Sequence, residues 1–203
     1  MHLSTKLILS ISLVLAAMPL AKADEGYWRA NSVYVVPEAD NADETIGANL
    51  ALGATFYIPN SENTNQLEIE AGWAKWDTDI GTNTPGSRND EVVFVPLLVN
   101  LRHELALTDT VRLAIGPSVG ASYIKVSGSL ANPTENITRQ DWILTYGGGA
   151  TLYFTITDSL SLSVGYRYLF NDDATFKVNG NKLELTDLNT HLFELGLRFA
   201  WPY

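Results

Sequence analysis

Residues 45–58 decide the fold class, and they run Thr45-Ile46-Gly47-Ala48-Asn49-Leu50-Ala51-Leu52-Gly53-Ala54-Thr55-Phe56-Tyr57-Ile58. From Ile46 to Ile58 every second residue is apolar, and the residues between them are mostly small or polar. Successive side chains of a β-strand point to opposite faces, so this period of two predicts a strand with one apolar and one small, polar face. The apolar face covers 13 residues, more than the roughly 9–11 that a tilted membrane strand needs.

The same alternation recurs along the chain. Six more segments show it: 67–74, 93–102, 112–123, 142–154, 160–170 and 193–201. A further strand is expected around Trp28 to Val36. Its alternation is poor, so the number of strands, rather than the residue pattern, places it there. Short links at 59–65, 106–110 and 156–159 alternate with longer, polar links at 37–43, 77–90, 127–141 and 171–189. Because no segment shows the helical period of 3.6, we predict an all-β fold, an eight-stranded antiparallel up-and-down β-barrel.

The composition excludes several classes of protein. The 203 residues suffice for one domain, and 46% of them are hydrophobic, too many for a disordered chain. The absence of cysteine excludes a disulfide scaffold, a thiolate metal site and a cysteine nucleophile. The formal net charge of −10 is opposite in sign to that of a typical nucleic-acid-binding protein. We therefore predict no nucleic-acid partner, no cofactor and no metal site.

The first 23 residues have the features of a secretory signal peptide. Lys6 precedes a short apolar core at 7–15, and Ala21 and Ala23 supply the small residues before a cleavage site. The alternative, a membrane anchor, needs about 20 apolar residues, and this core has nine. We expect residues 1–23 to be removed and residues 24–203 to form one barrel domain.

Two kinds of barrel fit the alternating strands. A soluble barrel of the lipocalin type turns its apolar face inward around a ligand, whereas a transmembrane barrel turns that face outward to lipid. Glycine, Ser and Thr dominate the opposite faces, as a narrow lumen requires. Those faces also carry four acids and four arginines but no lysine, which suits guanidinium–carboxylate pairing in a confined space. This predicted lumen charge network consists of Glu68, Glu70, Arg102, Glu104, Arg112, Arg167, Glu194 and Arg198.

Aromatic residues gather at both ends of the apolar faces. Near the long links lie Trp73, Tyr123, Trp142, Tyr168 and Phe170; near the short links lie Phe56, Phe154, Phe199 and Trp201. Two such girdles match the two interfaces of a membrane. Together with the long apolar faces they favour a transmembrane β-barrel, and a soluble ligand-binding barrel is the alternative.

The end of the chain, Leu195-Gly196-Leu197-Arg198-Phe199-Ala200-Trp201, resembles the C-terminal signal of Gram-negative outer-membrane proteins. The whole chain from residue 24 resembles the small eight-stranded barrels of that family, such as OmpA, OmpX and OmpW. The resemblance implies an outer-membrane location and insertion by the barrel-assembly machinery. It also implies contact with outer-membrane lipid and lipopolysaccharide. The residues that match the assembly signal are Gly196, Phe199, Trp201 and Tyr203.

Glu104 and Arg112 flank the short link at 106–110. If the turn is centred near Thr108, opposed residue numbers sum to about 216, and both side chains point inward as a cross-strand ion pair. Such a pair is either a gate in a pore or packing in a plugged lumen. An eight-stranded barrel leaves an interior about wide enough for side chains alone, which favours packing.

His103 and His191 fall on outward faces, without the spacing of metal ligands. A lipid-modifying enzyme would need a histidine with a serine and an acid, and no motif marks such a set. The long links are acidic, which suits either solubility or cation-bridged contact with lipopolysaccharide.

We expect an outer-membrane barrel with a structural or surface-interaction role, a plugged polar lumen and no enzymatic activity, whose surface partner the sequence does not identify. The alternatives are a narrow channel for small solutes, similar to OmpW, and a soluble periplasmic ligand-binding barrel.

Overall fold

The computed structural model describes residues 25–38, 42–78, 90–128, 137–178, 181–186 and 188–202. The predicted signal peptide and Tyr203 lie outside these residues. The strands are β1 (Glu25–Pro37), β2 (Thr45–Tyr57), β3 (Thr64–Thr78), β4 (Asp90–Ala106), β5 (Val111–Gly128), β6 (Ile137–Thr157), β7 (Leu160–Asn171), β8 (Ala174–Val178), β9 (Asn181–Leu185) and β10 (Thr190–Pro202). Among the described residues, no helix is long and apolar enough to cross a membrane.

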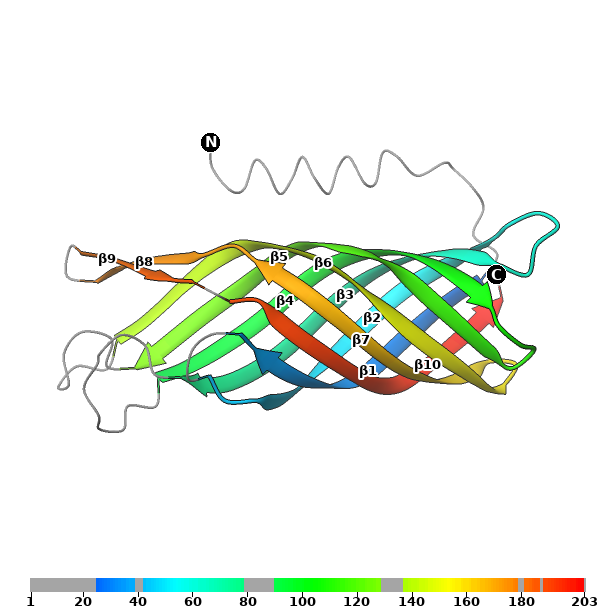
Figure 1. Cartoon of the computed structure of the whole chain (residues 1–203), viewed down its shortest axis with the longest axis horizontal. Coiled ribbons are helices and arrows are strands. Elements are labelled where there is room, and N and C mark those ends of the chain that lie inside the picture. Colours follow the sequence, from blue (N-terminus) through cyan, green and yellow to red (C-terminus); the bar gives the residue numbers. More distant parts are fainter. Residues whose placement is uncertain are drawn as a thin grey trace.

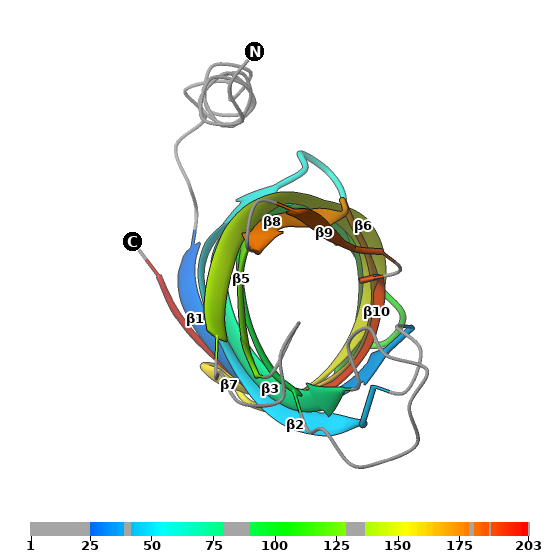
Figure 2. The same ribbon diagram turned by 90° about the vertical axis from the view of Figure 1, so that its left-hand side faces the viewer.

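Eight of the strands close into one barrel. Their order around the wall is β1-β10-β7-β6-β5-β4-β3-β2, and neighbouring strands are antiparallel. Figure 2 shows the wall end on as a closed ring, with β8 and β9 at its rim. Because β1 pairs with β10, the described wall strands leave no free edge whose backbone groups would lie unpaired in lipid. The predicted eight-stranded up-and-down barrel is confirmed.

The two ends of the barrel carry different connections. Short turns join β2 to β3, β4 to β5, and β6 to β7 at one end, which we call the turn side. At the opposite end, the loop side, β1 ends and β2 begins, β3 ends and β4 begins, β5 ends and β6 begins, and β7 ends and β10 begins (Figure 1). The predicted alternation of short and long links is therefore present.

Strand β2 shows how the sequence period sets the two faces of the wall. Ile46, Leu50 and Leu52 point outward and are exposed, whereas Asn49 and Ala51 point inward and are buried. Large exposed apolar side chains occur on all eight wall strands, which a water-soluble surface would not carry in such number. The outer face is therefore suited to lipid, as predicted for a transmembrane barrel.

The wall extends beyond a membrane's thickness on the loop side. Strands β4, β5 and β6 have 17, 18 and 21 residues, against the roughly 9–11 that suffice to span the bilayer. In this extension the outer face carries Lys75, Glu91 and Lys125, whereas Phe94 and Ile124 are buried inside. The polarity of the two faces is thus reversed there. The predicted links at 77–90 and 127–141 are shorter than expected because the strands continue into them.

The predicted link at 171–189 contains a hairpin, β8–β9, that the sequence pattern did not predict. Its two strands pair from Ala174 with Leu185 to Val178 with Asn181. The backbone N–H of Thr175 donates to Asp141 Oδ2 of β6 at 3.1 Å, which holds the hairpin beside that strand. Ala174 and Phe176 are buried in the interior of the extension. Strands of five residues are too short to show a clear period in the sequence.

Strand β1 alternates regularly in the structure, although the sequence pattern is poor. Tyr27, Arg29, Asn31, Val33 and Val35 are buried inside the barrel. This inward row changes from polar to apolar along the strand, because the strand crosses the polar part of the lumen and then the apolar extension. A face of mixed character hides the period of two.

We expect Leu50→Arg to destabilise the barrel in lipid by about 2–4 kcal/mol, since it places a charge on the outer face near the middle of the membrane. Leu107→Arg is the matched control: Leu50 and Leu107 are both 53% exposed, but Leu107 lies in the turn between β4 and β5. Its replacement should change stability by less than about 0.5 kcal/mol. Urea unfolding in phospholipid vesicles measures both. Equal losses would contradict the assignment of the outer face to lipid.

Candidate functional site

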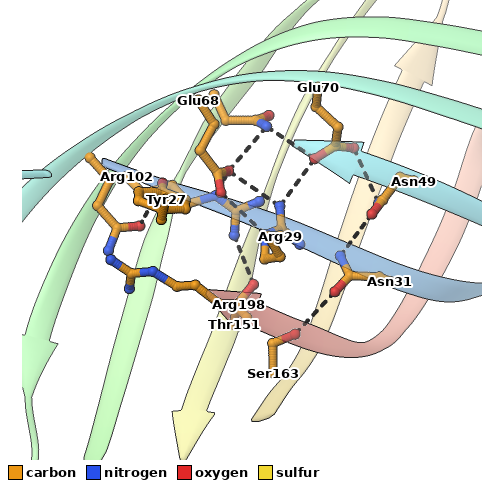
Figure 3. A network of polar contacts seen from close by, with 12 residues as sticks. Tyr27, Arg29, Asn31, Asn49, Glu68, Glu70, Arg102, Thr151, Ser163 and Arg198 are labelled. Carbon is orange, nitrogen blue, oxygen red and sulfur yellow. Dashed lines mark hydrogen bonds and ion pairs between the residues drawn. The ribbon is translucent and has the colours of Figure 1, made fainter. Parts of the chain in front are cut away.

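The middle of the lumen is organised around Arg29 of β1. Its side chain is 0% exposed, and its guanidinium contacts three carboxylates. Nε lies 3.1 Å from Glu68 Oε1, Nη2 3.1 Å from Glu70 Oε2, and Nη1 3.0 Å from Glu194 Oε2. Figure 3 shows Arg29 between Glu68 and Glu70. One cation thus joins β1 to both β3 and β10.

Two further arginines neutralise the same carboxylates. Arg167 Nη1 lies 2.8 Å from Glu70 Oε1, and its Nη2 lies 2.5 Å from Glu194 Oε1. Arg102 Nε lies 2.8 Å from Glu68 Oε2. Three arginines therefore face three glutamates with no net charge, and all six side chains are buried. We call this set the central cluster: Arg29, Glu68, Glu70, Arg102, Arg167 and Glu194.

Two neutral side chains add hydrogen bonds to the carboxylates of the central cluster. The Asn100 amide donates to Glu68 Oε2 at 3.2 Å and to Glu70 Oε2 at 3.1 Å. The Asn49 amide donates to Glu70 Oε1 and Glu194 Oε1, each at 3.2 Å. Buried charges persist when they are both paired and hydrogen-bonded, and these contacts meet that requirement. The ion pairs of the cluster cross the lumen and join β1, β3, β4, β7 and β10.

A second group of charges lies nearer the turns. Glu104 Oε2 lies 2.8 Å from Arg198 Nη1, and Glu104 Oε1 lies 3.1 Å from Arg112 Nη1. The Arg198 guanidinium lies 4.1 Å from the ring centroid of Tyr27 and 5.0 Å from that of Tyr153, a cation–π arrangement on two sides. We call Glu104, Arg112 and Arg198 the turn-side cluster. It borders a polar cavity of about 190 Å³ that extends to the turn residues Asp109 and Asp158.

The loop-side half of the interior is apolar. The buried side chains that fill it are Val33, Val35, Ala74, Trp76, Val92, Phe94, Leu98, Ile124, Val126, Ile143, Leu169, Ala174, Phe176, Leu188 and Leu192. A cavity of about 20 Å³ beside Val33, Phe94 and Leu192 holds no more than one water molecule. The predicted polar lumen therefore covers only the half nearer the turns, and apolar packing closes the other half.

All eight predicted lumen charges take part in these two clusters. Seven are buried inside, whereas the Arg112 side chain is 33% exposed at the turn side. Glu104 and Arg112 do form an ion pair, but the predicted sum of 216 is wrong. Glu104 lies opposite Ala114 and Arg112 opposite Ala106, so opposed numbers sum to 218 and the pair is diagonal. The turn is centred one residue later than expected, and long side chains bridge the offset.

Arg29 was not among the predicted lumen charges, although it makes more ion pairs than any predicted member. A sequence signal for it does exist: Arg29 lies two residues after Tyr27 and two before Asn31, so these three polar side chains share the inward face of β1. Of the residues matching the assembly signal, Gly196, Phe199 and Trp201 lie in β10, where it closes against β1.

His191 lies on the outer face at the loop-side rim and contacts an acid and a tyrosine. Its Nε2 lies 3.0 Å from Glu38 Oε1, and its Nδ1 lies 2.9 Å from the hydroxyl of Tyr166. Hydrogen bonds from Asn189 and Tyr168 lower the pKa of the Glu38 carboxyl below its ordinary value. His103 contacts Asn65 Oδ1 at 3.0 Å on the outer face of the turn side. No group of three potential metal ligands occurs among the described residues.

Known structures share this architecture at low sequence identity. No protein-family model matches the chain, and no curated protein sequence matches it. A major outer membrane protein from Thermus thermophilus is 16% identical with a TM-score of 0.61, over 87% of this chain and 99% of that one. OprG from Pseudomonas aeruginosa is 12% identical with a TM-score of 0.58, over 90% and 98%. The fold is that of the small outer-membrane β-barrels.

Ail, the attachment invasion locus protein of Yersinia pestis, is also similar in fold. It is 15% identical with a TM-score of 0.52, and the match covers 89% of this chain and 100% of Ail. Since each match spans nearly the whole of both chains, the likeness concerns the complete barrel. The predicted resemblance to small outer-membrane barrels is confirmed at the level of the fold.

We expect Arg29→Gln to destabilise the barrel by about 3–5 kcal/mol, because it leaves buried carboxylates without their shared cation. Arg112→Gln removes the same charge from a side chain that is 33% exposed and should cost less than about 1 kcal/mol. Urea unfolding in lipid, followed by tryptophan fluorescence, compares the two. Equal effects would contradict the central place of Arg29.

The Glu38 contacts predict a pH dependence. Folding lowers the pKa of this carboxyl, so its hydrogen bonds stabilise the barrel above the ordinary glutamate range, and this contribution is lost as the pH falls through the lowered folded value. The difference in unfolding midpoint between the wild type and Glu38→Gln should therefore shrink between about pH 7 and about pH 3. A difference that stays constant with pH would contradict this.

Proposed function

We propose that the protein is a non-conducting barrel of the outer membrane that anchors and presents its loop side to partners at the cell surface. The observation that carries this proposal is the double closure of the lumen. The central cluster fills its middle with ion pairs, and the apolar side chains of the extension fill its loop-side half. A barrel whose lumen is filled in both halves is suited to presenting its loop side to partners rather than to passing solutes.

The extension supports a surface role. It lifts the loop-side rim clear of the bilayer, with a polar outer face and an apolar core of its own, as in a water-soluble domain. The hairpin β8–β9 contributes to that core. Ail is named as an attachment protein. By analogy, we propose that the loop-side rim of this chain also contacts other molecules at the cell surface.

The proposal includes three sets of partners during the life of the protein. Outer-membrane lipid contacts the exposed apolar face, and lipopolysaccharide contacts the loop-side girdle, where the rings of Tyr123 and Trp142 lie 5.4 Å apart. The barrel-assembly machinery engages the C-terminal strand, which holds Gly196, Phe199 and Trp201. No catalytic role is proposed. His191 contacts Glu38 and Tyr166 on the outer face, and it does not line either of the two cavities described above.

A narrow channel is the second candidate function. The polar cavity of about 190 Å³ favours it, because this cavity gives solvent room at the turn side of the lumen. Conduction would require both the central cluster and the apolar side chains to move aside. Breaking the cluster would leave charges unpaired in a confined space, at a cost of about 3–5 kcal/mol for each uncompensated charge.

Planar-bilayer recording distinguishes the two functions. We expect the folded wild type, checked by its heat-dependent gel mobility, to show no steady opening. Arg29→Gln should also stay closed to large solutes, because the apolar half of the lumen is intact in that variant. A steady ohmic conductance of porin size in the wild type would sink the anchor proposal and favour the channel.

A further inference from the structure

The junction of β1 and β10 is the one place in the described wall where the first and last strands of the chain meet. Arg29 and Glu194, which bond across this seam, are 165 residues apart in sequence. Turns and loops tether every other pair of neighbouring wall strands, and a tight turn fixes the register of a hairpin directly. Side chains must therefore select the register of the seam.

Gly196 has a steric role at this seam. It lies opposite Asn31, and a Cβ at position 196 would lie 2.1 Å from the carbonyl oxygen of Ala30 and 2.1 Å from Asn31 Oδ1. The first of these atoms belongs to the backbone, so a change of side-chain rotamer does not relieve the contact. The neighbouring inward residues of β10, Glu194 and Arg198, both carry a Cβ. Only the glycine of this stretch lets the Ala30 carbonyl approach so closely.

Asn31 occupies the space that Gly196 leaves open. Its amide nitrogen donates to Asn49 Oδ1 of β2 at 2.8 Å, and its Oδ1 accepts from the hydroxyl of Ser163 of β7 at 3.0 Å (Figure 3). A longer contact of 3.4 Å reaches Glu194 Oε2. The side chain thus lies across the seam and ties β1 to strands on both sides of it.

A shifted seam would lose this fit. A shift by one residue turns every side chain of β10 to the opposite face, which places charges in lipid. A shift by two keeps the faces but sets Asn31 opposite Glu194 or Arg198 instead of Gly196. The carbonyl of Ala30 then meets a Cβ, and the amide moves about 6.6 Å along the partner strand. Both changes disfavour the shifted registers.

We propose that Gly196 and Asn31 form a register key that selects the seam pairing when the barrel closes, and with it the shear of the barrel. This assigns Gly196 a role in the folded wall that is separate from any recognition by the assembly machinery. The key acts at the closing step, because only then do β1 and β10 meet. It is independent of the proposed anchor function, since a channel would need the same closure.

Cysteine cross-linking tests the proposal directly, because the chain has no cysteine of its own. The outward residues Ala30 and Leu197 are opposed in the observed register. Ala30→Cys is combined in separate proteins with Leu197→Cys, Leu195→Cys or Phe199→Cys, which report the observed register and the two registers shifted by two. The proteins are folded into phospholipid vesicles without assembly machinery and oxidised. The wild-type background should give efficient cross-linking only for the first pair.

Asn31→Ala and Gly196→Ala are then placed in each background. We expect the ratio of observed to shifted cross-links to fall about tenfold or more, the effect of losing one or two net hydrogen bonds. Ser32→Cys with Ala48→Cys, opposed on β1 and β2, is the control pair and should be unaffected. Cross-linking that stays confined to the Ala30–Leu197 pair in the Asn31→Ala background would overturn the key.

Ser163→Ala covers the case in which Asn31→Ala and Gly196→Ala do not fold. It removes only the hydroxyl that donates to Asn31 Oδ1 at 3.0 Å and leaves Gly196 and the Ala30 carbonyl unchanged. We expect the ratio of observed to shifted cross-links to fall about fivefold, the effect of losing one net hydrogen bond. An unchanged ratio in the folded Ser163→Ala protein would count against the key.

Discussion

A buried guanidinium in a membrane barrel must find its counter-charges inside the wall, and Arg29 meets this requirement with three carboxylates. The cost of removing such charges from water is offset only by close pairing and complete hydrogen bonding. The partners of Arg29 lie on β3 and β10, and the same carboxylates also pair with Arg102 of β4 and Arg167 of β7. The ion pairs around one charge therefore connect five of the eight wall strands. Closure of the lumen follows from the same contacts.

The interior changes character where the wall leaves the membrane. Within the bilayer the apolar groups face outward and the charges face inward, whereas in the extension the apolar groups face inward and Lys75 and Glu91 pair outside at 2.6 Å. Each part places its apolar surface away from water. The extension therefore marks how far the protein stands above the bilayer, and it provides a firm base for the loop-side rim.

The sequence predicts the faces of β2 because one row is apolar and the other small over its whole length. It does not predict Arg29, because the inward row of β1 runs from polar Asn31 to apolar Val35 and the period of two is lost. Residue periodicity also carries no information on diagonal contacts, so the pair Glu104–Arg112 was expected in the wrong register. The three-way contact of Arg29 depends on barrel curvature, which sequence spacing does not express.

The side-chain Nε–H of Arg29 tests the central claim most directly. In the barrel folded in lipid nanodiscs, NMR can compare the hydrogen exchange of this group with that of Arg112, which is 33% exposed and serves as the internal reference. We expect a strongly protected Arg29 Nε–H, since it donates to Glu68 Oε1 at 3.1 Å in a buried cluster. Exchange of Arg29 as fast as that of Arg112 would contradict a lumen closed around this residue.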